Sequence, residues 1–211
     1  MLLYTIKINN LESSMRRKRR RRSTLNFGRT RKKFNVNKFK YVMTWVVEIA
    51  AVILAAYLCV ACFGIRTTVV GQAMSDTLEN GDQIFLNKIL YKISNPKADD
   101  VIVFLPNGNE KSHYYVRRVI GVPGDTIQIK DGAVYVNGEL YTEKIEVAAM
   151  EETGIAGDEL VLGEDEYFVL GDNRNNSEDS RYANIGNIKK EYIVGKAWFY
   201  IGAEEGSGFI H

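Results

Sequence analysis

The chain has 211 residues, of which 45% are hydrophobic and 26% charged, and its formal net charge is only +2. This composition excludes a collagen, a coiled coil and a largely disordered chain, and the length suits one or two domains. The net charge conceals a division: residues 1–42 hold 14 Lys and Arg and 1 acid (about +13), whereas residues 43–211 hold 14 and 25 (about −11). Two regions that face different partners are therefore expected. The two cysteines, Cys59 and Cys62, are too few and too close for a disulfide framework.

Residues 1–40 are the basic end of the chain. Seven consecutive basic residues occupy positions 16–22, and six more follow before residue 41. This pattern predicts a disordered cytoplasmic arm that binds anionic membrane lipid. Nucleic-acid binding is the alternative, but the run lacks interleaved stacking aromatics, which Phe27 and Phe34 do not supply. We therefore expect lipid, and no nucleic acid, as the partner of this arm.

Residues 41–65 are continuously apolar apart from Glu48. About 20 apolar residues suffice to cross a bilayer as a helix, so this segment predicts one uncleaved transmembrane helix. A buried core helix rarely stays apolar on all faces over this length, and the apolar part of a cleaved signal peptide is shorter. Basic flanks stay cytoplasmic, which predicts a single-pass plasma-membrane protein with its N-terminus inside and residues 66–211 outside. Glu48 is expected to snorkel to the interface, with a helix–helix contact as the alternative.

In residues 66–211 the continuous apolar pattern gives way to short runs of alternating apolar and polar residues, which are typical of β-strands. Asp131-Gly132 separates two of these runs and predicts a two-residue hairpin turn. The acidic, weakly patterned stretch 139–166 is expected to be a surface excursion. The sequence thus predicts a mainly β exported domain behind one N-terminal transmembrane helix. The expected strands are 82–88, 100–105, 114–122, 125–130, 133–138, 166–171 and 193–201.

Three segments of this domain resemble, in order and spacing, the motifs of the type I signal peptidases, particularly the Gram-positive kind with a single N-terminal anchor. GQAMSDTLENGD (71–82) is similar to the nucleophile motif G-x-S-M-x-P-T-L-x-x-G-D, and YYVRRVIGVPGDTI (114–127) to the general-base motif Y-x-K-R-x-x-G-x-P-G-D. GDNRNNSEDSR (171–181) matches every defined position of G-D-N-R-x-x-S-x-D-S-R. The resemblance implies a signal-peptidase-like β-sheet fold over residues 41–200.

The resemblance also implies a serine endopeptidase that removes signal peptides from exported proteins and uses neither a cofactor nor a metal. A serine attacks the peptide bond, and a neutral, buried lysine takes its proton. The backbone N–H at the nucleophile position helps to bind the oxyanion. In active relatives an extended peptide lies beside the serine, with small residues in two shallow pockets. The resemblance places Ser177 beside the lysine, pairs Asp172 with Arg118 and Asp179 with Arg181, and lines the peptide groove with Val69, Val70, Gly71, Met74 and Val116.

Both reacting positions depart from the family pattern. The nucleophile position is Ala73, which carries only a methyl group, and the base position is Arg117. An arginine is always a cation in a protein and cannot accept the serine proton. Asp76 also replaces the usual proline. We therefore expect the dyad mechanism to be lost.

Ser75 and His113 are the candidates for a substitute nucleophile and base. Ser75 would share the face of Ala73 if the segment were a strand, but it would lie about 6–7 Å further along it. His113 lies upstream of Arg117 and would be its base, whereas Lys111 has no evident reason to be buried. We expect neither to restore catalysis.

The sequence favours a membrane-anchored signal peptidase homologue that binds exported preproteins or pilin-like polypeptides as an accessory or assembly factor without cutting them. The family includes members without the dyad, some of them associated with pilin assembly. The alternatives are an active signal peptidase with a remodelled site, and a nucleic-acid or lipid-surface binder that works through residues 16–40.

Overall fold

The structure is a computed structural model that describes residues 35–63, 65–202 and 206–210. These residues form one long helix and a β domain. Most of the expected basic arm, residues 1–34, lies outside the described residues. The division of the chain into an arm (1–40), an anchor (41–65) and an exported domain (66–211) stays a prediction.

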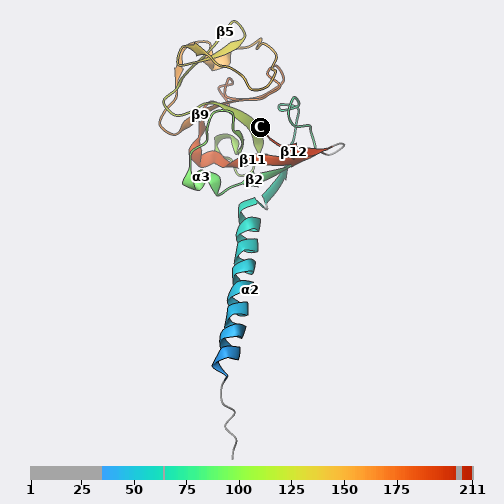
Figure 1. Ribbon diagram of the computed structural model, residues 1–211. Helices are drawn as coiled ribbons and strands as arrows, with labels where there is room; N and C mark the ends of the chain where they lie inside the picture. Colours follow the sequence, from blue (N-terminus) through green and yellow to red (C-terminus); the bar gives the residue numbers. More distant parts are fainter. Residues whose placement is uncertain (1–34, 64, 203–205, 211) are drawn as a thin grey trace, which may run out of the picture. The chain divides into compact units, whose positions relative to one another are not determined.

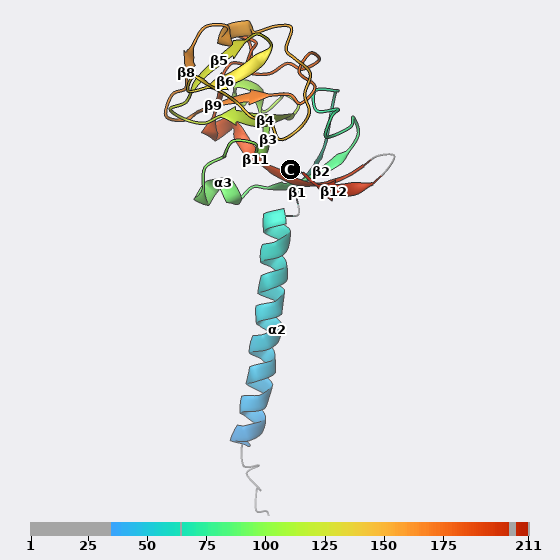
Figure 2. The same ribbon diagram turned by 45° about the horizontal axis from the view of Figure 1, so that its top comes forward.

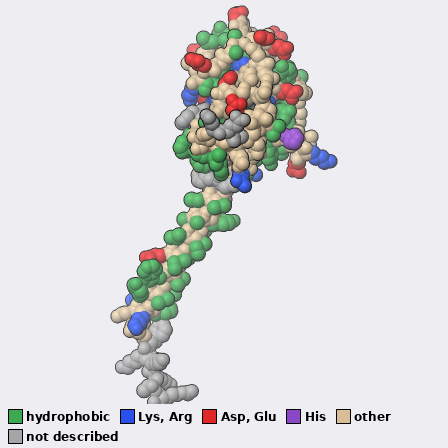
Figure 3. All heavy atoms as spheres, turned by 90° about the vertical axis from the view of Figure 1, so that its right-hand side faces the viewer, with side chains coloured by type: hydrophobic (Ala, Val, Ile, Leu, Met, Phe, Trp, Pro, Cys, Tyr) green, Lys and Arg blue, Asp and Glu red, His purple; other side chains and the backbone are tan. Residues whose placement is uncertain are grey.

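The long helix is α2 (Val36–Phe63), which begins five residues before the predicted apolar segment. Its 28 residues extend over about 42 Å, more than the ~30 Å of a bilayer's hydrocarbon core. Over Val36–Val60 none of the side chains is buried, whereas a core helix of a soluble protein would be mostly buried. Figure 3 shows hydrophobic side chains along its length. By length and composition α2 is a candidate membrane anchor.

Most strands of the β domain belong to one large antiparallel sheet. Its strand order is β1-β2-β11-β3-β4-β9-β10, with β12 paired to β11. Figure 1 labels β2, β9, β11 and β12 of this sheet. The strands are β1 (Ile65–Thr68), β2 (Gln83–Asn87), β3 (Val101–Phe104), β4 (Tyr115–Gly121), β9 (Glu166–Leu170), β10 (Ile188–Lys189), β11 (Ile193–Ile201) and β12 (Ser207–Phe209).

A second, four-stranded sheet has the order β7-β6-β5-β8. Its strands are β5 (Thr126–Lys130), β6 (Ala133–Val136), β7 (Glu139–Leu140) and β8 (Leu160–Val161). The predicted hairpin joins β5 to β6: Asp131 has φ 52° and Gly132 has φ 77°. A type I′ turn requires positive φ at both central residues, so the hairpin prediction is confirmed. The short helices are α3 (Leu90–Ile93), η1 (Pro106–Gly108), η2 (Gly154–Ala156) and η3 (Lys190–Tyr192).

The core is built on both faces of the central strands. On β3, Val101 and Val103 belong to one buried cluster, whereas Ile102 and Phe104 belong to another. A strand covered on both faces reads as a continuous apolar run, as VIVF does. A third cluster joins the two sheets, because residues of β4 and β9 pack against β5 and β6 (Figure 2).

All seven predicted strands are present, and the mainly β fold class is confirmed. The expectation that residues 139–166 form only a surface excursion is wrong. Met150, Ala156 and Leu162 are buried in the cluster that joins the two sheets. The apolar runs of this stretch, such as 147–150 and 160–162, are short and separated by acidic residues, so they show no sustained periodicity and only their tertiary contacts reveal this burial. The short strands β1, β7, β8, β10 and β12 were not predicted either.

Candidate functional site

The nucleophile motif lies in the loop between β1 and β2. Residues 73–77 form turns in which the amides of Thr77 and Leu78 donate to the carbonyl oxygen of Met74, at 2.8 and 2.6 Å. Ala73 and Ser75 therefore do not lie on a strand, and the strand spacing between them does not apply. In this segment the chain turns back on itself, because local i to i+3 and i to i+4 bonds replace sheet pairing.

The turn at Ala73 contacts the loop of residues 171–181. The carbonyl oxygen of Ala73 accepts a hydrogen bond of 3.1 Å from the amide of Asn173. A Cβ added to Gly171 would lie 2.5 Å from that carbonyl oxygen and 2.5 Å from Ser177 Oγ, so these two oxygens lie within 5 Å of one another. This contact requires a glycine at position 171. The structure thus brings the nucleophile position and Ser177 together.

Arg117 extends from β4 toward the same loop. Its Nε and Nη2 donate to the carbonyl oxygen of Glu178 at 2.8 and 2.5 Å, and its Nη1 donates to the carbonyl oxygen of Val116 at 2.7 Å. Its Cζ lies 5.0 Å from the centre of the Tyr115 ring, a cation–π contact. Because Glu178 follows Ser177 directly, the base position and Ser177 are also neighbours. The three predicted positions therefore gather around one loop.

The charge of Arg117 is buried, with 6% of the residue exposed. Burial lowers the pKa of its guanidinium, and the negative charge of Asp179 offsets part of this effect. The group nevertheless remains a cation, because an arginine does not lose its proton in a protein. Within the described part of the chain, Arg117 forms no ion pair. The base position is thus held by a buried cation that only donates hydrogen bonds.

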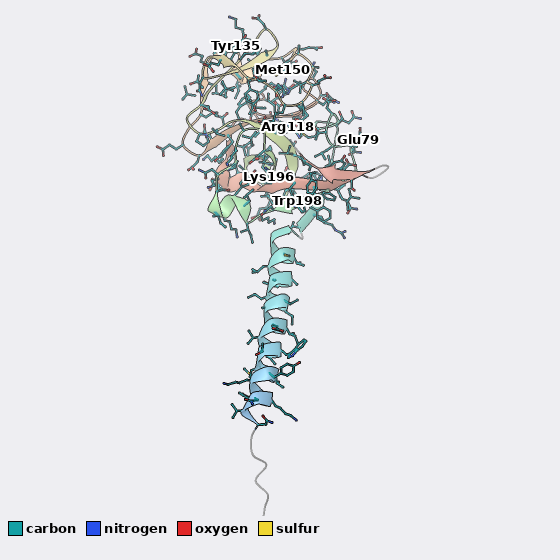
Figure 4. All side chains as sticks on the ribbon, in the orientation of Figure 1. Glu79, Arg118, Tyr135, Met150, Lys196 and Trp198 are labelled. Carbon is teal, nitrogen blue, oxygen red and sulfur yellow. The ribbon has the colours of Figure 1, made fainter. Side chains whose placement is uncertain are left out.

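Both ion pairs implied by the family resemblance are present. Arg118 donates to Asp172 through Nε at 2.9 Å and Nη2 at 2.8 Å, and both side chains are almost fully buried. Burial lowers the pKa of Arg118, but the hydrogen bonds and charge of Asp172 outweigh it and leave the pKa raised. Figure 4 labels Arg118 in the interior of the β domain. Arg181 forms the same bidentate contact with Asp179: its Nε donates to Oδ1 at 2.8 Å and its Nη2 to Oδ2 at 2.9 Å.

Ser177 is 9% exposed, and its hydroxyl donates to Oδ2 of Asp179 at 2.5 Å. The same oxygen accepts the amide N–H of Gly171 at 3.1 Å. The hydroxyl proton of Ser177 is therefore directed to a carboxylate that also fixes the loop. Its assignment as an orienting group for a lysine stays a prediction, because position 117 holds no amine.

The five residues expected to line a peptide groove divide into two groups. Val69, Met74 and Val116 are between 1% and 4% exposed and pack in one core cluster, whereas Val70 and Gly71 are exposed. Their role as groove residues stays a prediction, and the three buried side chains would contact a peptide only from beneath.

An open cavity of about 480 Å³ lies beside β1. It is lined by Thr67, Thr68, Val70 and Tyr114 among others, and His113 is in its wall. Within the described residues β1 pairs with β2 alone, so its other edge is free. A free sheet edge next to a cavity is suited to binding an extended peptide. Thr67 and Thr68 were not predictable as site residues, because their place on a sheet edge depends on the strand order.

The candidate substitutes for the dyad, Ser75 and His113, have other surroundings. Ser75 Oγ accepts a hydrogen bond of 2.8 Å from Asn173 Nδ2, and His113 is exposed. Among the described residues no hydrogen bond joins Ser75 to His113, and Lys111 is exposed. In the same part of the chain no group of three or more metal-binding side chains is placed to hold an ion.

Two contacts of the site were missed at the sequence level. Asn173 binds the turn at Ala73 through its amide and its side chain, and Thr77 donates its hydroxyl to Asp172 at 2.5 Å. Asn173 is a defined position of the third motif, which is a signal that was available. Thr77 also occupies a motif position, but its partner is 95 residues away along the chain, so the pairing follows only from the fold.

Comparisons with known proteins agree with the three motifs. The family described as "Signal peptidase, peptidase S26" matches residues 42–201. Signal peptidase I of Bacillus licheniformis is 34% identical over 173 residues, covering 78% of this chain and 91% of the relative. Signal peptidase I T of Bacillus subtilis (strain 168) is 39% identical over 137 residues, covering 61% and 69%. A crystal structure of a signal peptidase I from Enterococcus faecalis V583 has 29% identity and a TM-score of 0.38, covering 49% of this chain and 97% of that one.

Proposed function

The chain belongs to the signal peptidase family, peptidase S26, and from this premise we propose that it is a non-catalytic member that binds exported polypeptides without cutting them. The family implies exported preproteins as the class of polypeptide. The single observation that carries the proposal is the pair of residues at the dyad positions, Ala73 and Arg117.

Each residue removes a different part of the reaction. The methyl group of Ala73 has no oxygen with which to form an acyl-enzyme. Arg117 cannot accept a proton, and its guanidinium donates to two backbone carbonyl oxygens rather than to a nucleophile. The nearby hydroxyls of Ser75 and Ser177 have an amide and a carboxylate as partners, respectively. None of these contacts supplies the neutral base that a serine peptidase needs.

Binding does not need the dyad. An extended peptide that is added to a free strand edge is held by main-chain hydrogen bonds, and the free edge of β1 beside its cavity offers them. We further propose that the chain is anchored by α2 with its N-terminus cytoplasmic, that residues 1–40 bind anionic lipid, and that pilin-like precursors are among the bound polypeptides. Protease treatment of sealed membrane vesicles tests the orientation: the β domain should be cleaved from the extracellular side only.

The test of the proposal is a cleavage assay on the full chain in detergent with a preprotein substrate. We expect no cleavage by the parent protein and measurable cleavage by the Ala73→Ser/Arg117→Lys double variant, which restores both reacting groups. Each single variant should stay inactive, because a serine without a base and a base without a serine both fail. Adding Asp76→Pro to the double variant should raise the activity by restoring the family's turn.

The alternative function is an active signal peptidase with a remodelled site, and the same assay decides it. Cleavage by the parent protein would overturn the proposal. If Ser75→Ala or His113→Ala then abolished that cleavage, the remodelled site would be identified. Without cleavage, binding of a preprotein and of a pilin-type precursor to the parent protein is measured by titration, and absence of binding to both would contradict the proposal.

A further inference from the structure

Arg117 carries a buried charge that the described residues leave without a counter-ion. Its three hydrogen bonds all go to backbone carbonyl oxygens, of Glu178 and Val116. The neighbouring carboxylate of Asp179 is occupied through both oxygens by Arg181 and also accepts the hydroxyl of Ser177. A buried charge is costly unless it is paired. The charges of Asp179 and Glu178 offset this cost only in part, because burial still leaves the pKa of Arg117 lowered, so a further anion would be stabilised here.

The guanidinium has donors available for such an anion. It carries five N–H groups, and the three hydrogen bonds above use one each on Nε, Nη1 and Nη2. One N–H on each of Nη1 and Nη2 thus has no acceptor among the described residues. The carboxylate of Glu178 does not accept a hydrogen bond from Arg117; its Oε2 accepts one from the hydroxyl of Tyr115 at 3.2 Å.

A second donor lies at the nucleophile position. Neighbouring amides in this loop have acceptors: Ser75 donates to Gln72, and Thr77 and Leu78 donate to Met74. The amide N–H of Ala73 has no acceptor in the described part of the chain. A backbone N–H and a guanidinium near one loop form a cationic donor set that suits a carboxylate.

We propose that Arg117 and the amide N–H of Ala73 bind the C-terminal carboxylate of a peptide whose last residues lie along the free edge of β1. The inference rests on the proposed function and names the ligand class of the same site. A peptide bond in the middle of a polypeptide offers only a neutral carbonyl oxygen there, whereas a chain end offers a full negative charge. The protein therefore prefers the end of a cut peptide to an uncut segment of the same sequence.

This preference places the protein after a hydrolysis step. A free C-terminus within an exported sequence arises when another endopeptidase hydrolyses a peptide bond and adds water across it. The carboxyl-side fragment carries a new amino group and lacks the group that the site recognises. The amino-side fragment carries the new carboxylate and is the expected ligand. The site chemistry thus assigns the protein to the retention of one of the two products.

The experiment compares two peptides on the full chain in detergent. Both have ten uncharged residues of alternating threonine and valine and end in alanine, and both carry the same fluorophore at the N-terminus. One has a free C-terminal carboxylate and the other a C-terminal amide. We expect fluorescence anisotropy to give a Kd about tenfold or more lower for the carboxylate, as charged hydrogen bonds require.

Variants then assign the preference to Arg117. Arg117→Gln keeps a polar side chain but removes the charge, so the ratio of the two Kd values should fall to about one. Arg117→Lys should keep part of the preference, because it keeps the cation. Lys130→Gln removes an exposed charge at the end of β5 and should leave the ratio unchanged. Circular dichroism of each variant checks that it folds like the parent.

The outcomes separate the two proposals. Equal binding of both peptides overturns the carboxylate site and leaves the binding function standing. A carboxylate preference that survives in Arg117→Gln also overturns it, since another cation would then be responsible. If neither peptide binds, and no preprotein binds in the titration above, both the function and the site are refuted.

Discussion

Replacing Asp172 by asparagine removes the negative charge from a buried ion pair at the centre of the β domain. The side chains of Arg118 and Asp172 are 1% and 0% exposed and are joined by two hydrogen bonds. Thr77 adds a third bond to the same carboxylate. The Asp172→Asn side chain has nearly the same volume, so the variant changes charge and hydrogen bonding rather than packing. Arg118 then stays a buried cation that has lost the negative charge of Asp172.

The magnitude follows from this burial. Removing one partner of a buried ion pair costs about 3–5 kcal/mol of unfolding free energy. The asparagine retains one oxygen acceptor, and Arg118 keeps its hydrogen bond to the carbonyl oxygen of Asp99, so we expect the lower end, about 3 kcal/mol. With a urea slope of ~2 kcal/mol per M, the unfolding midpoint should fall by about 1.5 M.

The assay is urea unfolding of the full chain in detergent, followed by near-ultraviolet circular dichroism, which reports tertiary packing of the β domain. Lys144→Gln is the matched control, because it breaks an ion pair of similar length to Asp99 on a side chain that is 67% exposed. An exposed pair is worth about 1 kcal/mol or less. The reasoning is refuted if Asp172→Asn lowers the midpoint no more than Lys144→Gln does.

Two further predictions concern packing and pH. Gly171→Ala would place a Cβ 2.4 Å from Ser177 Cβ, so we expect the unfolding free energy in the same urea assay to fall by about 1–3 kcal/mol. The control is Gly163→Ala, whose Cβ meets only the end of the Glu166 side chain at 3.3 Å and which should lose less stability. Equal losses in the two variants would contradict the close approach at Gly171. Burial, followed by the charge and hydrogen bond of Asp100, raises the pKa of Tyr91. The folded state therefore holds this proton more tightly than the unfolded state, and the resulting stability is fully present below pH ~10 and lost as the pH rises above it. The fall of the urea midpoint between pH 10 and 12 should be shallower in Tyr91→Phe, and parallel curves would show that Tyr91 does not contribute.

Regular strands were predictable because their periodicity is local. The run VIVF of β3 and the alternating TIQIK of β5 each bury side chains in a pattern that the sequence displays. The two-residue strands β7, β8 and β10 were not predictable, since so short a strand is specified by its partner and not by its own residues. The burial of Met150 was not predictable either, because the run 147–150 is too short to display a period.

The candidate site was located by its motifs, yet several contacts at its centre required the fold. Gly171 marks a motif position, but only the structure shows that the space beside it is filled by Ser177 and by the carbonyl oxygen of Ala73. The expected groove residues Val69, Met74 and Val116 are buried in the core, each with less than 5% of its surface exposed. Apolar residues near a reacting position serve packing or binding equally well, so the sequence alone does not separate the two.

The sequence by itself determined which chemistry the two reacting positions allow. A methyl group at Ala73 and a guanidinium at Arg117 are properties of the residues themselves, and no fold turns them into a nucleophile and a proton acceptor. Only the tertiary structure decided that Arg117 is buried, that it bonds the carbonyl oxygen of Glu178, and that Asp179 is already committed to Arg181. Arg117 and Glu178 are 61 residues apart along the chain and meet because β4 lies beside β9, which leads into the loop of residues 171–181. Whether a charge is paired depends on that meeting, since electrostatic energy is set by distance and burial rather than by sequence separation.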